Sequence, residues 1–194
     1  SHLPDCQLHS DPVVQQLARL EPPLGEVLDV ACGRGQLSIL LVELGLATRF
    51  TGLDWDRRKV EVCQVAAGED GRAIVADATR AELAPVDTVL IIDALHYLAR
   101  EERRALLERA AAALRPGGRL VIRELDPKRG LRSRIAQWAE RVGSRVGMNR
   151  GAVCEWVDPA ALSAEVAALG LSPRLVPHPD DKPSPNYLLI ADKA

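Results

Sequence analysis

The chain has 194 residues, of which 47% are apolar and 27% are charged, and its formal net charge is −2. This length predicts a single domain over residues 1–194, with a full hydrophobic core and the composition of a globular protein. A near-neutral charge and 3% aromatic residues argue against nucleic acid as a partner. No stretch approaches the roughly 20 apolar residues of a membrane span, and the first residues lack the apolar core of a signal peptide.

The four cysteines are scattered along the chain, at positions 6, 32, 63 and 154. They form no Cys-x-x-Cys pair and accompany no histidine cluster, so we expect neither a metal site nor a disulfide framework. The pattern is typical of reduced cysteines in a cytoplasmic protein.

Strand and helix patterns alternate from residue 11 onward. Helical patterns cover 11–20, 36–46, 57–67, 99–115 and 158–170; strand patterns cover 27–30, runs ending at 54 and 77, 86–95 and 119–125. This alternation predicts a parallel sheet with helices on both faces. The last two strand patterns, 173–178 and 186–192, are joined by a loop too short for a crossover helix. We therefore expect them to form an antiparallel hairpin at one edge of the sheet.

The segment VLDVACGRGQLS, residues 27–38, has the pattern of a strand, a glycine turn and a helix. Such a turn presents backbone N–H groups to a ligand at the carboxyl end of the strand. Three aspartates fall at successive strand ends: Asp29, Asp54 and Asp77. Each could be a turn or cap residue, but the three together suit one ligand. Asp29 matches an ammonium group, Asp54 the two hydroxyls of a ribose, and Asp77 an adenine amino group.

S-adenosylmethionine carries all three groups and no phosphate. The rival ligand is a nicotinamide dinucleotide, whose G-x-G-x-x-G motif is incomplete here because its third position is Ser38. Asp29 would also repel a pyrophosphate. The sequence therefore favours S-adenosylmethionine.

The chain resembles the class I S-adenosylmethionine-dependent methyltransferases over residues 12–126. VLDVACGRGQLS, TGLDWD, IVADA and VDTVLIIDALHYL resemble the family's first four motifs, and LRPGGRLVIRELD resembles the segment through its fifth strand. The resemblance implies an α/β fold, a doubly wound Rossmann-like sheet of seven strands in the order 3-2-1-4-5-7-6. It is much less specific for the substrate. Cys32 departs from the family's usual smaller residue.

The same resemblance implies roles for single residues. It places Asp29, Ala31 and Gly33 at the methionine end of the cofactor, and Gly35 where the backbone approaches it closely. It places Asp54 on the ribose, Trp55 against the adenine, Asp77 and Ala78 at the adenine edge, and Asp93 beside the methionine moiety.

Methyl transfer is a displacement at a sulfonium carbon, so the protein mostly positions the reactants. A base is needed only when the acceptor must lose a proton. His96 follows the fourth strand and is the candidate base; the alternative is a capping or packing role at the start of the next helix. Glu124 and Asp126 end the fifth strand; they either line the acceptor pocket or pair with Arg123 or Lys128.

The segment after the fifth strand is basic. Residues 123–150 carry eight basic and three acidic side chains, a local charge of +5. We interpret 127–157 as a helical lid insertion over the acceptor. A basic lid predicts an acidic small-molecule acceptor or one carried by an acidic acyl carrier protein. The alternative is a solvated helix face.

IRELDPKRGLRSR and the ending PRLVPHPDDKPSPNYLLIADKA faintly resemble small bacterial methyltransferases of aryl-polyene and related polyketide pigment pathways. That resemblance implies O-methylation of an aromatic, carrier-bound acceptor and a role in secondary metabolism. Two other functions stay open: a non-catalytic cofactor-binding module that serves a partner, and a protein or RNA methyltransferase.

Overall fold

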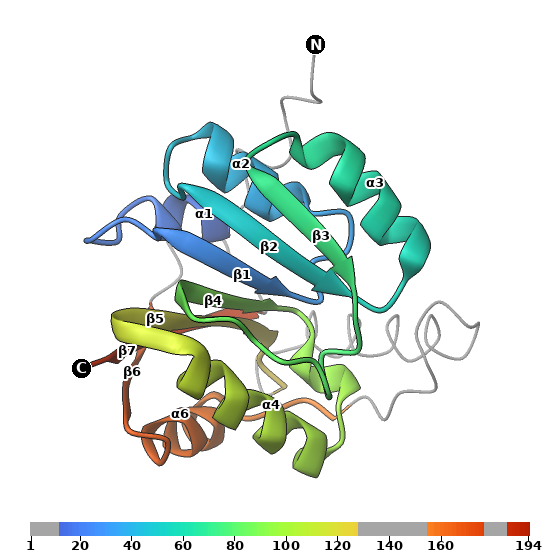
Figure 1. Ribbon diagram of the computed structural model, residues 1–194. Coiled ribbons are helices and arrows are strands. Elements are labelled where there is room, and N and C mark those ends of the chain that lie inside the picture. Colours follow the sequence, from blue (N-terminus) through green and yellow to red (C-terminus); the bar gives the residue numbers. More distant parts are fainter. Residues whose placement is uncertain (1–11, 128–154, 177–185) are drawn as a thin grey trace.

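A seven-stranded sheet forms the centre of the computed structural model, which describes residues 12–127, 155–176 and 186–194 (Figure 1). The strands are β1 (Glu26–Val30), β2 (Arg49–Asp54), β3 (Gly71–Val75), β4 (Val86–Ile92), β5 (Leu114–Leu125), β6 (Leu171–Val176) and β7 (Asn186–Lys193). Their order across the sheet is β3-β2-β1-β4-β5-β7-β6. This is the order implied by the methyltransferase resemblance, and it confirms the predicted fold class.

Strands β1 to β5 are parallel to one another, whereas β7 pairs antiparallel with both β5 and β6. The predicted antiparallel hairpin at one edge is therefore confirmed. Because parallel strands end at the same edge of a sheet, the ends of β1 to β5 lie together. That shared edge is where open α/β sheets bind ligands.

The helices cover both faces of the sheet. They are α1 (Pro12–Leu17), α2 (Gln36–Glu43), α3 (Arg57–Ala67), α4 (Arg100–Ala113) and α6 (Pro159–Ala167), with a 3-10 turn η1 (Leu95–Tyr97) after β4. Helices α1, α2 and α3 lie over one face, and α4 and α6 lie over the other (Figure 1). In β4, Val89 and Ile91 pack toward α4 and α6, while Leu90 packs on the opposite side. This alternation is the period of two expected of a strand with both faces covered.

Strand β5 begins earlier than the sequence predicted. The helical pattern suggested a helix through residue 115, but α4 ends at Ala113 and Leu114 already pairs with Val86 of β4. The register between the two strands then shifts before Thr88 pairs with Arg119. Pro116, which stops the helix, therefore lies within a bulged strand.

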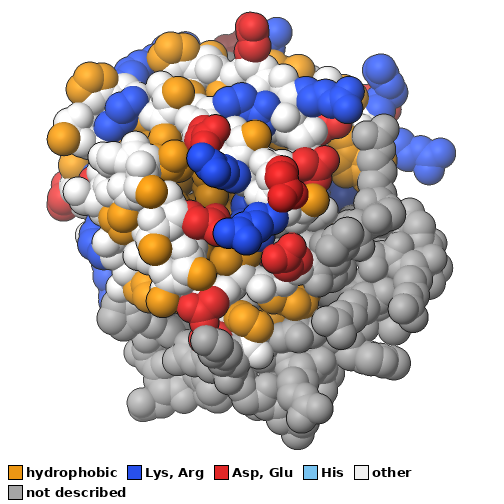
Figure 2. All heavy atoms as spheres, turned by 90° about the horizontal axis from the view of Figure 1, so that it is seen from below, with side chains coloured by type: hydrophobic (Ala, Val, Ile, Leu, Met, Phe, Trp, Pro, Cys, Tyr) orange, Lys and Arg blue, Asp and Glu red, His pale blue; other side chains and the backbone are white. Residues whose placement is uncertain are grey.

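Acidic and basic side chains are interspersed on the face that carries α4 and α6 (Figure 2). Arg104 and Glu108 form an i,i+4 ion pair along α4, and Arg103 pairs with Glu165 of α6. No helix within the described residues is long and apolar enough to cross a membrane. Most of the predicted basic lid, from residue 128 to 154, lies outside the described residues.

Candidate functional site

The turn between β1 and α2 depends on glycine at position 35. Gly35 has a left-handed φ of 73° and is the N-cap of α2. A Cβ at this position would also collide with the sulfur of Cys63 on α3. The turn is tied to the neighbouring strand, because the Gly33 N–H donates to Asp54 Oδ2 at 2.9 Å. The glycines therefore hold the turn against α3 and β2.

Asp54 ends β2 and is only 5% exposed. Its Oδ1 accepts the backbone N–H of Asp56 at 2.8 Å, in addition to the Gly33 contact at Oδ2. A carboxylate has about four lone-pair sites. Two backbone hydrogen bonds leave Asp54 able to accept from further hydroxyls.

Asp29 lies within β1, one residue before the strand ends, and its carboxylate is buried. The Ser38 hydroxyl of α2 donates to Asp29 Oδ2 at 2.6 Å. Burial raises the pKa of Asp29 to about 7; the Ser38 hydrogen bond opposes this rise and the nearby Asp54 charge adds to it. A buried carboxyl with such a pKa gains most from a cationic ligand, which would stabilise its ionised form.

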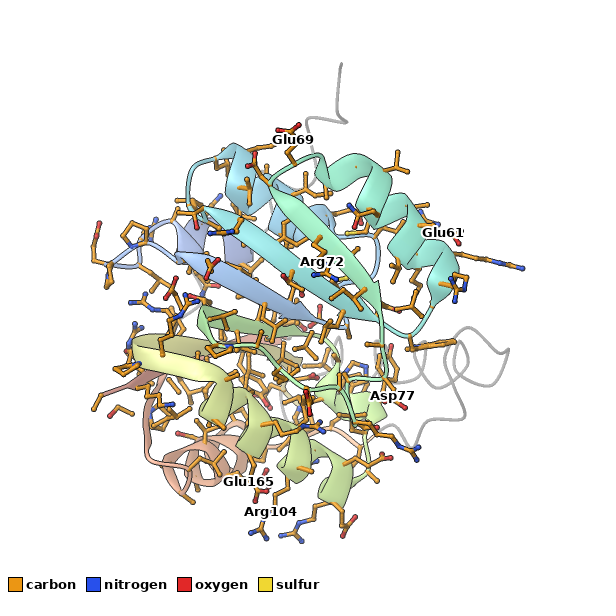
Figure 3. All side chains as sticks on the ribbon, in the orientation of Figure 1. Glu61, Glu69, Arg72, Asp77, Arg104 and Glu165 are labelled. Atoms are coloured by element: carbon orange, nitrogen blue, oxygen red, sulfur yellow. The ribbon has the colours of Figure 1, made fainter. Side chains whose placement is uncertain are left out.

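Hydrogen bonds to Asp77, within the loop, and from Arg109 of α4 hold the loop after β3. Asp77 Oδ1 accepts the Thr79 N–H at 2.9 Å and the Thr79 hydroxyl at 2.7 Å. Arg109 of α4 donates to the carbonyl oxygens of Ala78 and Thr79, each at 2.6 Å. Figure 3 shows Asp77 beyond the tip of β3, on the side of α4.

Two cavities adjoin the end of β1. The first, of about 240 Å³, includes Trp55, Asp77, Ala78 and Tyr97 in its lining. The second, of about 330 Å³, is lined by Asp29, Cys32, Asp93 and Arg123, among others. Ala31 lines both cavities and has a left-handed φ of 61°. The two cavities therefore meet at one backbone position, directly after β1.

The second cavity contains an ion pair between the ends of β4 and β5. The Arg123 guanidinium contacts Asp93 through Nη2 at 2.5 Å and Nε at 3.1 Å. The Asp93 N–H also donates to the Arg123 carbonyl oxygen at 2.9 Å. Asp93 has a left-handed φ of 53°. A non-glycine residue in this region is strained, and such strain is common at functional sites.

His96 and Glu124 form a second pair between the same two strand ends. His96 lies on η1 and is 3% exposed, and Glu124 on β5 is 1% exposed. His96 Nδ1 lies 2.8 Å from Glu124 Oε2, and the Leu95 N–H donates to Glu124 Oε1 at 2.6 Å. The imidazole stacks on Trp156, with ring centroids 4.1 Å apart.

The structure brings most of the predicted site residues together. Asp29, Ala31, Trp55, Asp77, Ala78 and Asp93 line the two cavities; Gly33 and Asp54 are joined beside them. Gly35 instead faces Cys63. His96 is not among the described residues that line either cavity. The individual roles assigned to all ten residues stay predictions.

Sequence reasoning missed several contacts. In the sequence, Ser38 marks only a break in a dinucleotide motif, whereas in the structure it donates to Asp29. No sequence motif points to Arg109. The sequence allows a pair between Glu124 and Arg123, but Arg123 pairs with Asp93 and Glu124 with His96. The strand period offers a signal, because Arg123 and Glu124 are neighbours on β5 and must face opposite sides of the sheet.

The described residues contain no group of histidine, cysteine, aspartate or glutamate side chains that could hold a metal ion. Cys32 and Cys63 are free thiols, and burial raises the pKa of both. Cys6 and Cys154 lie outside the described residues.

Comparison with known proteins identifies the part of the chain that carries this site. Residues 27–118 match the family described as "Methyltransferase domain". A ubiquinone biosynthesis O-methyltransferase from Xanthomonas axonopodis pv. citri is 27% identical over 160 residues, 79% of this chain and 65% of that protein. Another protein of that name, from Idiomarina loihiensis, is 33% identical over 107 residues, 52% of this chain and 42% of its own length. The chain thus spans less than two thirds of these curated relatives.

Solved structures share the fold. An S-adenosylmethionine-dependent methyltransferase from Mesorhizobium loti has a TM-score of 0.75 at 18% identity, covering 96% of this chain and 100% of that one. Magnesium protoporphyrin IX methyltransferase from Synechocystis PCC 6803, solved with bound SAH, has a TM-score of 0.72 at 21% identity, covering 96% and 84%. At these identities the likeness establishes the fold alone.

Proposed function

From its place in the class I S-adenosylmethionine-dependent methyltransferase family, we infer that this chain is an enzyme that binds S-adenosylmethionine and methylates an oxygen of a small molecule. The observation that carries the proposal is the set of three carboxylates at the ends of β1, β2 and β3, beside two adjoining cavities. The bound SAH in the Synechocystis structure supports the same cofactor.

The residues present fit this cofactor. The first cavity takes the adenine, with Trp55 against the ring and Asp77 and Ala78 at its edge. The second takes the methionine moiety, where Asp29 faces the ammonium group and Asp93 lies alongside. Asp54, which keeps acceptor capacity beyond its two backbone contacts, holds the ribose hydroxyls. When bound, the cofactor supplies an electrophilic methyl group on a sulfonium, with a good leaving group already in place.

Because the leaving group needs no activation, the chain's own contribution is to position the acceptor and remove its proton. His96 follows the strand whose end lines both cavities through Asp93 and Ala94. We assign it the role of general base for an acceptor hydroxyl. The O-methyltransferase names of the relatives support an oxygen acceptor.

The acceptor is proposed to be acidic or carried by an acidic acyl carrier protein, as the basic composition of residues 123–150 suggests. We include aromatic polyketides of pigment pathways, bound to such a carrier protein, among the proposed acceptors. Changing Arg132 and Arg134 to Ala should then raise the acceptor KM and leave cofactor affinity unchanged. If the partner is a carrier protein, the KM effect should shrink at higher salt, because exposed charge pairs are screened. No change in KM would favour a solvated face for the basic segment.

We place the reaction in the cytoplasm.

Transfer of tritiated methyl groups to a panel of phenols, phenolic acids and carrier-bound aryl chains tests the proposal. We expect labelled product from at least one acidic acceptor. Tight binding of S-adenosylhomocysteine with no transfer to any small molecule, protein or RNA would favour the alternative, a non-catalytic module that serves a partner.

A further inference from the structure

We propose that Glu124 is a positioning residue that holds His96 in its proton-accepting tautomer. The proposal rests on the proposed function, since it requires a reaction in which His96 takes a proton. It goes further by naming the group that prepares the base.

Both oxygens of Glu124 are used within the fold. Oε1 accepts the Leu95 N–H at 2.6 Å, and Oε2 lies 2.8 Å from His96 Nδ1. An ionised carboxylate only accepts hydrogen bonds, so Nδ1 must carry the proton. The other ring nitrogen, Nε2, is then left as the acceptor.

The orientation of the ring is fixed as well. His96 lies against Tyr97, with ring centroids 3.9 Å apart, and stacks on Trp156 at 4.1 Å with the ring planes 21° apart. The Glu155 N–H donates to the His96 carbonyl oxygen at 3.0 Å. These contacts hold both the imidazole ring and the backbone of His96. We therefore expect a change at Glu124 to alter which ring nitrogen carries the proton and to leave the ring itself in place.

The contacts described so far provide no partner for the other ring nitrogen of His96, Nε2. It is buried and has no hydrogen-bond partner within the part of the chain that the structure describes. Buried ring nitrogens are usually paired, and an exception calls for an explanation. His96 follows β4 closely, and the residues between them include Asp93 and Ala94, which line the second and the first cavity respectively. An acceptor hydroxyl is the partner that this nitrogen would gain during the reaction.

The step balances without a further reactant. The acceptor oxygen forms a bond to the methyl carbon, and its hydroxyl proton passes to Nε2. The carbon–sulfur bond breaks, and its electron pair stays on the sulfur. The imidazolium later releases the proton to solvent. Glu124 keeps its contact with Nδ1 throughout.

The Glu124→Gln substitution separates this role from a structural one. Glutamine has the same size but a single oxygen. If that oxygen accepts the Leu95 N–H, the amide NH₂ faces His96 Nδ1 and forces the proton onto Nε2. The base is then lost while η1 stays anchored. A general base contributes typically about 10²–10⁴-fold to the rate, and the corresponding Asp→Asn change in the Ser-His-Asp triad, which leaves the wrong histidine tautomer, lowers kcat by about 10⁴-fold.

The experiment compares wild type, Glu124→Gln, Glu124→Asp and Glu165→Gln. Glu165→Gln is the control for the loss of a glutamate in another ion pair, because Glu165 pairs with the buried Arg103 of α4 and makes no hydrogen bond to His96. Nitrogen-15 NMR of the imidazole identifies the tautomer, and steady-state assays use catechol and 3,4-dihydroxybenzoate as probe acceptors. Calorimetry with S-adenosylhomocysteine reports the cofactor site.

We expect wild type to show the Nδ1–H tautomer and Glu124→Gln to show Nε2–H. In Glu124→Gln, kcat should fall at least 100-fold with KM and S-adenosylhomocysteine affinity changed less than twofold. Glu124→Asp should recover part of kcat, and Glu165→Gln should match wild type. Should Glu124→Gln fail to fold, the wild-type tautomer and the Glu124→Asp kinetics still decide the question.

An Nε2–H tautomer in wild type would overturn the proposal, as would an active Glu124→Gln enzyme that keeps its kcat. Failure of the proposed function looks different. Wild type would then bind no S-adenosylhomocysteine, or would methylate neither probe nor any other hydroxyl acceptor, whatever its histidine tautomer.

Discussion

The two halves of the ligand-binding edge are built differently. At the ends of β1, β2 and β3, carboxylates are bound by nearby backbone N–H groups and a hydroxyl: Asp54 by Gly33 and Asp56, and Asp29 by Ser38. At the ends of β4 and β5, carboxylates are bound by cationic or ring side chains about 30 residues away: Asp93 by Arg123, and Glu124 by His96. In the first half, the donors lie 2, 9 and 21 residues from their carboxylates in the sequence, whereas in the second half the partners are 28 and 30 residues apart.

This difference has a chemical consequence. A carboxylate bound by single N–H or O–H donors keeps lone pairs for a ligand's hydroxyl or ammonium groups. A carboxylate bound by a guanidinium or imidazole is engaged with a partner of its own, and it acts by fixing that partner. The β1–β3 ends are thus suited to holding a cofactor, whereas the β4–β5 ends, which also contribute Asp93 to the second cavity, are suited to positioning side chains. The following predictions test this division.

The largest effect is expected at Asp54. Replacing it with Ala removes the proposed ribose contact and frees the Gly33 N–H. We expect S-adenosylhomocysteine binding to weaken by about 1.5–3 kcal/mol, measured by calorimetry. Asp56→Ala is the control, because the Asp56 side chain caps α3 and should affect helix stability without a comparable loss of affinity. Unchanged binding in Asp54→Ala would remove this aspartate from the cofactor site.

Asp29→Asn should stabilise the free protein at neutral pH while weakening cofactor binding. Because the pKa of Asp29 is raised to about 7, the folded state holds a proton between pH 4 and 7 that the unfolded state has released. The free energy of unfolding therefore falls as pH rises through this range. Asparagine removes that dependence, and we expect a gain of about 1–3 kcal/mol at pH 8, measured by urea unfolding at pH 5 and 8. A variant less stable than wild type at both pH values would contradict the account.

The same titration should appear in binding. An ammonium group favours ionised Asp29, so wild type should bind S-adenosylhomocysteine more tightly as pH rises from 6 to 8. Since about a tenth of Asp29 is ionised one unit below its pKa, we expect up to about a tenfold change. Calorimetry across this range gives the slope, and Asp29→Asn provides the flat reference. Equal slopes for the two proteins would exclude Asp29 as the titrating group.

A smaller effect is expected at Arg109 of α4, which donates hydrogen bonds to the loop after β3, where Asp77 and Ala78 are the proposed adenine contacts. Replacement with Met keeps the length of the side chain but removes the hydrogen bonds to Ala78 and Thr79. We expect S-adenosylhomocysteine affinity to fall by about 0.5–1.5 kcal/mol, with little change in the affinity of methionine alone, which lacks the adenine. Arg104→Met, on the exposed face of α4, is the matched control. Equal losses for both ligands would mean that Arg109 acts on the whole fold.

The comparison also explains what the sequence could predict. The fold and its strand order were predicted through the family resemblance that the short motifs carry. The same motifs place the candidate cofactor residues at strand ends, because Asp54 and the turn after β1 are part of the motifs themselves. The pairing of Glu124 with His96, by contrast, depends on which face of β5 each residue occupies and on how β4 and β5 are aligned. Position within a motif does not contain that information. The early start of β5 at Leu114 was missed for the same reason, because its pairing with Val86 overrides the local helical pattern.

Side-by-side calorimetry of the wild-type protein with S-adenosylhomocysteine and with NAD tests the central claim most directly. Both ligands contain adenosine, but only the first carries an ammonium group for Asp29 and no pyrophosphate. The account predicts one S-adenosylhomocysteine bound per chain and no detectable heat with NAD. Binding of NAD in its place, or of neither ligand, would contradict it.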